Sequence, residues 1–275
     1  MHRPPPIHCA AVTELGRVRS RNEDCIHIDP QSGLVAVADG MGGHLAGDVA
    51  SRLAIAALVA AMRVVSDAVP ALPPTLPRAS PADLLQSAVA QANAQVFAAA
   101  NTLPGCIGMG TTLLAAWFTR TGDGTPQLVI AHVGDSRLYR YRKSASGTGE
   151  LQPLTRDHTT VQELIDGGLY PPEEVRRLVR RNYLTRAIGI EPTVDSDLRT
   201  LPVAADDLFI LCSDGLSGLL EDSQILAVIA QHPDPAHRDL QSLAQQLADA
   251  ANERGGHDNI SVVLARLATS SLPSA

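Results

Sequence analysis

Apolar positions along the chain follow two spacings, and each spacing predicts one kind of element. Segments 46–67 and 81–102 carry apolar residues at helical spacing, and Ser80 is a suitable N-cap before Pro81. Segments 222–231 and 239–253 are also predicted helices. Strands are predicted over 111–119, 127–142, 207–213 and 260–267, with 127–142 as the hairpin partner of 111–119.

These elements come in an order that indicates the fold class. The strands form hairpins and the helices stand in separate blocks, without repeated βαβ alternation. The order favours an α+β fold in which helices cover antiparallel sheets. A chain of 275 residues is long enough for one large domain or two small ones. The polar segment 157–184 is predicted to be helical in two pieces, separated by Gly167-Gly168 and Pro171-Pro172.

Four apolar runs each meet an aspartate, and an acidic pair, Glu23-Asp24, precedes a further apolar stretch. The four aspartates are Asp39, Asp135, Asp214 and Asp258. A carboxylate at the end of a buried strand is costly to desolvate unless a cation meets it. Mg²⁺ and Mn²⁺ prefer all-oxygen ligands of this kind. The pattern therefore predicts a centre that binds more than one divalent metal ion.

Charge and composition exclude several classes of partner. The formal net charge is −7 and aromatic residues make up 3 % of the chain, which argues against nucleic acid or an anionic membrane as partner. The four cysteines form no CxxC pair, and the N-terminus has no apolar stretch typical of a secretory signal. We therefore expect reduced thiols and a cytoplasmic protein.

Eight motifs occur in one order along the chain. They are RxxNED at 19–24, DGMGGH at 39–44, GMGTT at 108–112, GDSR at 134–137, LTRDH at 154–158, LTRAIG at 184–189, SDGL at 213–216 and HDNIS at 257–261. Together they resemble the metal-dependent protein phosphatases, the PPM or protein phosphatase 2C family, in its bacterial single-domain form. The match runs from about Val12 to Leu267, nearly the whole chain.

The resemblance implies one catalytic domain over 1–275, built as an α-β-β-α sandwich. The Ser, Thr, Ala and Pro composition after Leu267 predicts a frayed tail near 268–275. It implies hydrolysis of phosphoserine and phosphothreonine in proteins by a hydroxide shared between two Mn²⁺ or Mg²⁺ ions, and a Ser/Thr kinase that supplies the substrates. It assigns Asp39 as the bridging ligand, the Gly40 carbonyl to one ion, and Asp214 and Asp258 to the other. It assigns Asp24 as the acid that holds metal-bound water, with Glu23 as the acid beside it. It assigns Asp135 to a third, weaker ion that is shared with Asp214. Arg19 matches the arginine that binds the substrate phosphate.

Two features of the resemblance leave alternatives open. Some eukaryotic relatives carry a histidine where Met41 stands; His44, three residues on, is either a general acid or a residue that orders the loop. The segment 157–182 matches a flap beside the active site of bacterial members, and it carries a basic cluster. This cluster, either a docking surface for phosphoproteins or a solvated helix face, consists of Arg176, Arg177, Arg180 and Arg181.

Other phosphatase and nucleotide-binding classes fail on spacing. No cysteine has the arginine six residues later that a cysteine phosphatase requires, and the glycines at 105–110 lack the lysine of a P-loop. Two alternatives remain. One is a catalytically inactive adaptor that binds phosphoproteins, although such a protein should have lost one of Asp39, Asp214 or Asp258. The other is a metal-dependent phosphodiesterase acting on small molecules.

Overall fold

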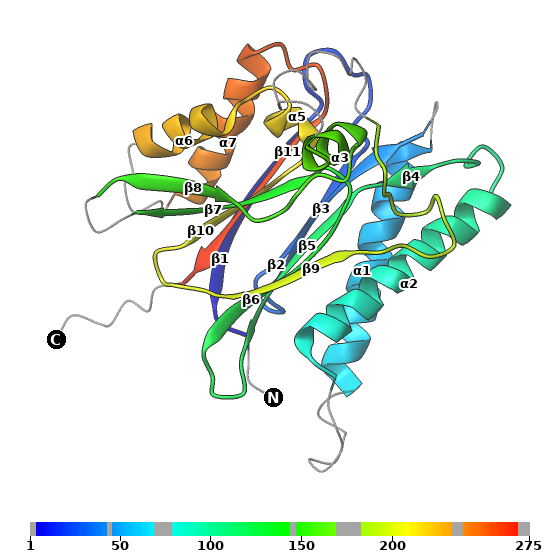
Figure 1. Cartoon of the computed structure of the whole chain (residues 1–275), viewed down its shortest axis with the longest axis horizontal. Helices are drawn as coiled ribbons and strands as arrows, with labels where there is room; N and C mark the ends of the chain where they lie inside the picture. Colours follow the sequence, from blue (N-terminus) through cyan, green and yellow to red (C-terminus); the bar gives the residue numbers. More distant parts are fainter. Residues whose placement is uncertain are drawn as a thin grey trace.

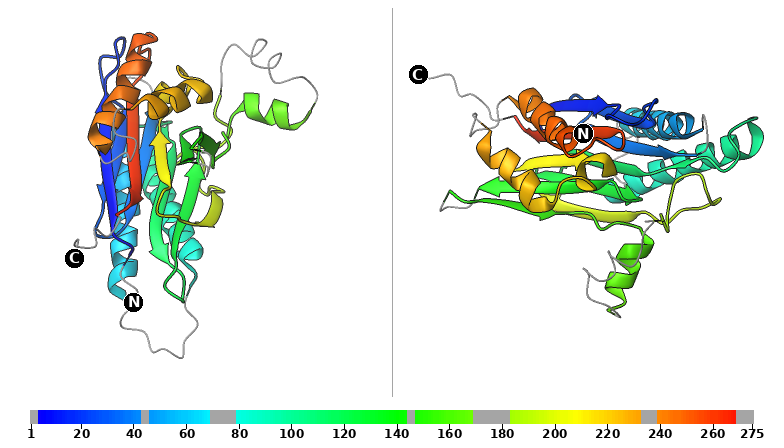
Figure 2. Two further views of the ribbon diagram at one scale, coloured as in Figure 1. Left: turned by 90° about the vertical axis from the view of Figure 1, so that its left-hand side faces the viewer. Right: turned by 90° about the horizontal axis from the view of Figure 1, so that it is seen from above.

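Two antiparallel sheets face each other, and helices cover the outer face of each sheet (Figure 1). The computed structural model describes residues 4–42, 46–68, 79–143, 147–168, 183–232 and 239–268. The views in Figure 2 show the layers edge-on. This arrangement is the predicted α-β-β-α sandwich, so the fold class is confirmed.

The first sheet has five strands and the second has six. In spatial order the first contains β1 (Ile7–Glu14), β11 (Ile260–Leu267), β10 (Leu208–Cys212), β7 (Arg137–Lys143) and β8 (Gly149–Pro153). The second contains β2 (Asp24–Asp29), β3 (Leu34–Met41), β5 (Leu113–Arg120), β6 (Pro126–Val133) and β9 (Asp197–Pro202), and β4 (Gly110–Thr111) pairs with β3.

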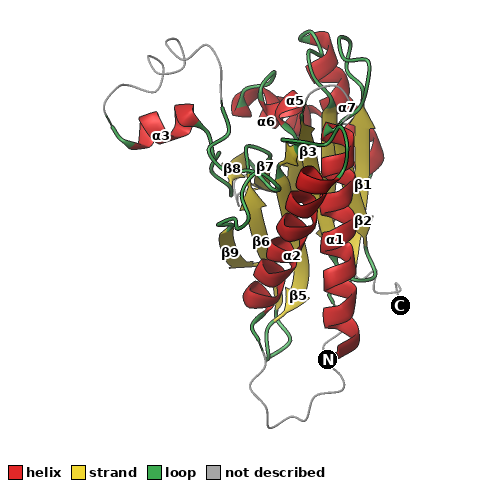
Figure 3. Ribbon diagram, turned by 90° about the vertical axis from the view of Figure 1, so that its right-hand side faces the viewer, coloured by secondary structure: helices red, strands yellow, loops and turns green. Residues whose placement is uncertain are grey.

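Helices α1 (Gly47–Ala68) and α2 (Pro81–Thr102) lie across the six-stranded sheet (Figure 3). Helices α6 (Asp222–Gln231) and α7 (Leu240–Glu253) pack on the five-stranded sheet. The first five residues of β3, at 34–38, are all apolar because both faces of the strand are buried. Leu34, Ala36 and Ala38 face the layer of α1 and α2, whereas Val35 and Val37 face the other sheet. A strand buried on both faces carries a continuous apolar run.

The start of α2 is fixed by a capping box, as the sequence predicts. The Asp83 amide donates to Ser80 Oγ at 3.1 Å, and the Ser80 amide donates to the Asp83 carboxylate at 3.1 Å. Pro81 follows at the first helical position, where its missing N–H costs nothing.

Ser80→Ala should lower the free energy of unfolding by about 1 kcal/mol, because the Asp83 amide loses its acceptor, Ser80 Oγ. Urea unfolding followed by circular dichroism measures the change. The control is Ser87→Ala, an exposed position inside the same helix, where alanine is the better helix former. Equal destabilisation by both substitutions would contradict the capping role.

The prediction of one long strand over 127–142 is wrong. The chain breaks at 134–136, so that β6 belongs to the six-stranded sheet and β7 to the five-stranded sheet. Gly134 makes the break possible with φ +109°, and a Cβ there would lie 2.6 Å from Thr112 Cγ2. This crossing between sheets places Asp135 at the junction of the two layers.

The described part of the flap contains one short helix, α3 (Thr160–Asp166), which stands apart from both helical layers (Figures 2 and 3). It ends before Gly167-Gly168, as predicted; the second predicted piece and the tail beyond 268 lie outside the described residues. None of the helices in the described ranges combines the length and the apolar character that crossing a bilayer requires.

Candidate metal centre

Asp24 and Asp39 lie directly opposite each other in the register of β2 and β3. Asp24 is buried and Asp39 is half-buried. Burial raises the pKa of Asp24 to about 7, with repulsion from Asp214 and Asp258 adding to the effect. Burial also raises the pKa of Asp39 well above its usual range, and the neighbouring charges of Asp24, Asp214 and Asp135 raise it further. The fold thus brings these acids to one place.

Asp214 and Asp135 reach the same place from other layers. Asp214 opens the short helix α5 (Asp214–Ser217) directly after β10, and its carboxyl is hydrogen-bonded to that of Asp39. Asp135 lies in the crossing between the sheets. Its pKa rises to about 7 through burial and through repulsion from Asp214 and Asp157. The carboxyls of Asp24, Asp39, Asp135 and Asp214 therefore come from four strand ends in both sheets and meet in one place, which we call the acidic region.

Glu23 and Gly40 meet at the start of α1, where the backbone is too close for side chains. A Cβ on Gly40 would lie 2.0 Å from the Gly47 carbonyl oxygen, and one on Gly47 would lie 2.7 Å from Glu23 Cδ. Glycine is required at both positions for this close approach. Burial raises the pKa of Glu23, and the charge of Asp48 adds to the rise. Asp48 was not predicted as a site residue, although it stands in the first turn of a predicted helix.

Arg19 lies beside this acidic region. Its Nη2 lies 2.6 Å from Asp258 Oδ2, and its side chain is 49 % exposed. The charges of Asp258, Glu23 and Asp214 raise its pKa, against the opposing effect of burial. Arg19 therefore lies between solvent and the predicted ligands, where an incoming phosphate would meet it.

The chemistry of the donor set fits hard divalent cations. Asp24 Oδ1, Asp48 Oδ1 and Asp214 Oδ1 are buried and have no hydrogen-bond partner among the described residues. Buried polar atoms without partners are rare unless an ion or water meets them. Within the described ranges, no group of three His, Cys, Asp or Glu side chains is already arranged around one point as metal ligands. Two of the predicted ligands have other partners instead: Asp258 contacts Arg19, and Asp214 contacts Asp39. A cation at this site would replace both contacts.

Comparison with known proteins decides the family. A model described as protein phosphatase 2C matches residues 17–261. The chain belongs to this family. It is 34 % identical over 261 residues to the serine/threonine phosphatase stp of Listeria welshimeri, covering 94 % of this chain and 95 % of that one.

Solved structures agree with this assignment. The serine/threonine phosphatase PstP/Ppp of Mycobacterium tuberculosis superposes with a TM-score of 0.77 and 36 % identity, over 96 % of this chain and 99 % of that one. The catalytic domain of PstP in complex with two manganese ions gives a TM-score of 0.75 and 35 % identity, over 96 % and 99 %. The predicted class, a serine/threonine protein phosphatase, is confirmed, and neither the adaptor nor the phosphodiesterase alternative is favoured.

Three further motifs of this phosphatase support the segments that carry Asp39 and Asp135. The amide of Asp39 donates to Thr112 Oγ1 at 2.9 Å, and Thr111 Oγ1 donates to the Asp39 carbonyl at 2.8 Å, so GMGTT holds the end of β3. Arg137 donates to both oxygens of Asp157, from Nε at 2.9 Å and from Nη2 at 2.7 Å. GDSR and LTRDH therefore fasten the base of the flap beside Asp135.

Some predicted residues of the phosphatase lie outside the described residues. These are the candidate general acid His44 and the flap cluster Arg176, Arg177, Arg180 and Arg181. The other predicted positions all lie in or around the acidic region. These are Arg19, Glu23, Asp24, Asp39, Gly40, Asp135, Asp214 and Asp258.

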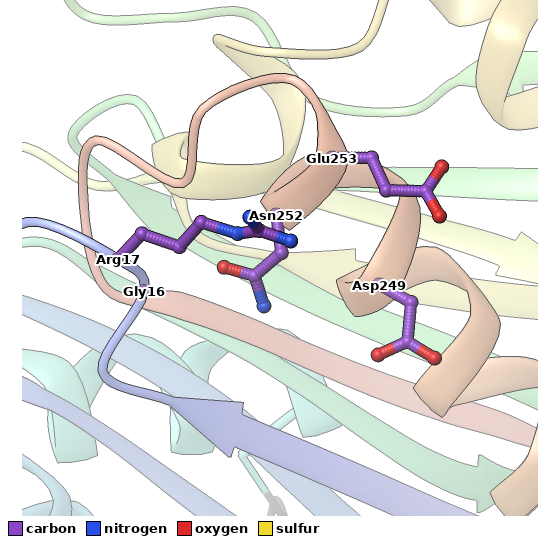
Figure 4. A pocket seen from close by; sticks show the side chains of 5 residues that line it. All are labelled: Gly16, Arg17, Asp249, Asn252 and Glu253. Carbon is purple, nitrogen blue, oxygen red and sulfur yellow. The ribbon is translucent and has the colours of Figure 1, made fainter.

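A separate surface pocket of about 310 Å³ opens next to the loop that carries Arg19. Figure 4 shows its lining, in which Gly16 and Arg17 of this loop face Asp249, Asn252 and Glu253 of α7. None of the predicted metal ligands lines it. The pocket is therefore distinct from the acidic region, although the loop that carries Arg19 contributes to both.

Proposed function

We propose that this phosphatase holds two divalent ions, Mn²⁺ or Mg²⁺, with Asp39, Asp214 and Asp258, and that Arg19 binds the phosphate of the substrate. The observation that carries this proposal is the convergence of buried carboxyls from separate strand ends, beside one half-exposed arginine. The relative solved with two manganese ions has the same fold, which supports this number and kind of ion.

When bound, the ions supply Lewis-acid stabilisation of the phosphoryl oxygens and activate water for in-line attack. The protein's own residues do the rest. Asp39 lies between Asp24 and Asp214, so its two oxygens can serve two ions at once. The Gly40 carbonyl is the neighbouring donor, and the absence of a side chain leaves the approach open. Glu23 and Asp24 are placed to orient water, and Asp135 to hold a third ion beside Asp214.

Arg19 binds the substrate phosphate by charge and by geometry. The guanidinium is planar, permanently charged and carries five N–H donors, which suits two parallel contacts to phosphate oxygens. Its half-exposed position lets a phosphoserine or phosphothreonine on a protein surface reach it. Release of Asp258 from Arg19 would leave this carboxylate for the metal ion.

The biological setting is part of the same proposal. A phosphatase of this class requires a Ser/Thr protein kinase that produces its substrates. The four cysteines are free thiols, which supports a reducing compartment such as the cytoplasm. The flap arginines at 176, 177, 180 and 181 remain candidates for docking the phosphoprotein.

The purified protein with Mn²⁺ should release inorganic phosphate from a phosphothreonine peptide and leave a bis-aryl phosphodiester almost untouched. A phosphomonoester offers the charged oxygens that Arg19 and the ions bind together, whereas a diester lacks one of them. Phosphate release by malachite green and diester cleavage by absorbance are the two measurements. Binding of the peptide without phosphate release would indicate an adaptor instead, and preference for the diester would indicate a phosphodiesterase.

A further inference from the structure

Asn259 follows the predicted ligand Asp258, and its side chain makes an unusual set of contacts with one other segment. It is 4 % exposed. Its Nδ2 donates to the Leu15 carbonyl at 3.1 Å and to the Arg21 carbonyl at 2.8 Å. Its Oδ1 accepts the Glu23 amide at 2.9 Å. One carboxamide therefore binds the backbone of the segment 15–23 at three points.

The segment 15–23 contains Arg19, and polar contacts rather than apolar packing hold it in place. Val18 is 66 % exposed and Leu15 is also exposed, so the loop is not held by burial of its apolar side chains. A second anchor is the Arg17 amide, which donates to the Gly256 carbonyl at 2.8 Å. Because both N–H groups of one amide bind the carbonyls of Leu15 and Arg21, the two ends of the loop are drawn to a single nitrogen.

The contacts also tie the loop to the site. The backbone N–H of Asn259 donates to Asp258 Oδ1 at 2.8 Å, and Arg19 Nη2 donates to the other oxygen of the same carboxylate. The backbone carbonyl of Asn259 lies so close to Gly215 that a Cβ on this glycine would stand 1.9 Å from its oxygen. Asn259 is thus held in place between the start of β11 and the start of α5. Its side-chain hydrogen bonds then hold the loop that carries Arg19 against this fixed point.

We propose that Asn259 is the positioning residue of the substrate arginine: it closes the loop 15–21 so that the Arg19 guanidinium stays over the acidic region. This inference rests on the proposed phosphate-binding role of Arg19. An asparagine is needed because the position requires two donors and one acceptor at a fixed reach. A misplacement of about 1 Å in a binding group can cost about 100-fold in rate.

The test is a double-mutant cycle of Asn259→Ala with Arg19→Ala, measured as kcat/KM on a phosphothreonine peptide with saturating Mn²⁺. Asn259→Ala alone should lower kcat/KM by about 100-fold, mainly through KM if Arg19 grips phosphate equally in substrate and transition state. In the Arg19→Ala background the same change should cost less than about threefold, because the residue it positions is gone. An equal loss in both backgrounds would overturn the proposal, and so would an Arg19→Ala protein with unchanged kcat/KM.

A matched control separates positioning from stability. Asn93 is also buried, its Nδ2 donates to the Glu191 carbonyl at 3.0 Å, and its Oδ1 accepts the Gly189 amide at 2.8 Å. Asn93→Ala should therefore lower the melting temperature about as much as Asn259→Ala does, while kcat/KM stays within about threefold of the original. If both variants lose activity in proportion to stability, Asn259 has only a structural role.

The isosteric Asn259→Asp variant keeps the acceptor for the Glu23 amide and lacks both donors to the loop, so it remains informative if Asn259→Ala does not fold. Its added negative charge can only favour Mn²⁺ by simple electrostatics. Loss of kcat/KM with Mn²⁺ affinity retained in calorimetric titration supports the proposal. Weakened Mn²⁺ binding that accounts for the lost activity would place Asn259 in the metal centre and overturn it. The Asn259 variants test only the positioning role, whereas phosphate release by the unaltered enzyme tests the proposed function. A negative result for Asn259 therefore does not affect the proposed function.

Discussion

The Asp39→Asn protein should lose turnover of a phosphothreonine peptide by about a thousandfold or more while keeping its fold. Asp39 is opposite Asp24 and hydrogen-bonded to Asp214, so it is the only described carboxyl whose pKa is raised by Asp24, Asp214 and Asp135 together. An amide has the same shape but lacks the charge that holds two cations. Uncatalysed hydrolysis of phosphate monoesters is so slow that little activity remains without the centre.

The matched control is Asp29→Asn at the opposite end of β2. Asp29 Oδ1 accepts the Gln31 amide at 3.0 Å, a contact that an asparagine oxygen can keep, and this end of the strand is remote from the acidic region. Its kcat/KM should stay within about threefold. Near-normal turnover in a folded Asp39→Asn protein, checked by circular dichroism, would refute the bridging role.

The core of this fold was predictable because its strands are apolar on both faces. The runs that became β3, β10 and β11 are dominated by buried Val, Ile, Leu and Ala, and a run of this kind predicts a buried strand whichever strand pairs with it. The helix over 81–102 was predictable from its N-cap as well as from its apolar stripe. The aspartates at the ends of the apolar runs also indicated where the metal site would form.

The edges of the sheets were not predictable from periodicity. β1, β8 and β9 lie at sheet edges and mix polar with apolar residues, so their pattern does not differ clearly from that of loops. The break between β6 and β7 was missed for another reason. β6 is mainly apolar and β7 mixes basic with apolar residues, so the run 127–142 resembles one strand, and the crossing depends on the positive φ of Gly134, which an alternation pattern does not encode.

In the site, the motifs identified the acids but not their surroundings. Asp48 was missed because an acid in the first turn of a helix is ordinarily explained by the helix dipole. The contacts of Asn259 join residues more than 200 positions apart, so no local pattern could reveal them. Long-range hydrogen bonds of this kind become visible only when the sheets are assembled.

In metal-free solution, Asp39→Asn should stabilise the protein at pH 8 by more than about 1 kcal/mol, the reverse of its effect on activity. Removing one of several buried like charges relieves repulsion and desolvation that no cation offsets. The variant must be compared with the original protein in EDTA, by thermal or urea unfolding. Addition of Mn²⁺ should reverse the order, because ligand at 100 times its Kd stabilises the original protein by about 2.7 kcal/mol and the variant binds it poorly.

The pH dependence of this difference provides the internal check. Burial and neighbouring acids raise the pKa of Asp39 above the usual value of 3.8, and they raise those of Asp24 and Asp135 to about 7. A group whose pKa is higher in the folded state contributes stability below pH 3.8 and loses it as the pH rises through the folded value. In EDTA the advantage of Asp39→Asn should therefore be small near pH 4.5 and grow towards pH 8. His132, whose pKa burial lowers to about 3, opposes this trend in both proteins and cancels in the difference. A stability difference that is constant with pH, or that shrinks as the pH rises, would mean that burial and the neighbouring acids do not raise the pKa of Asp39.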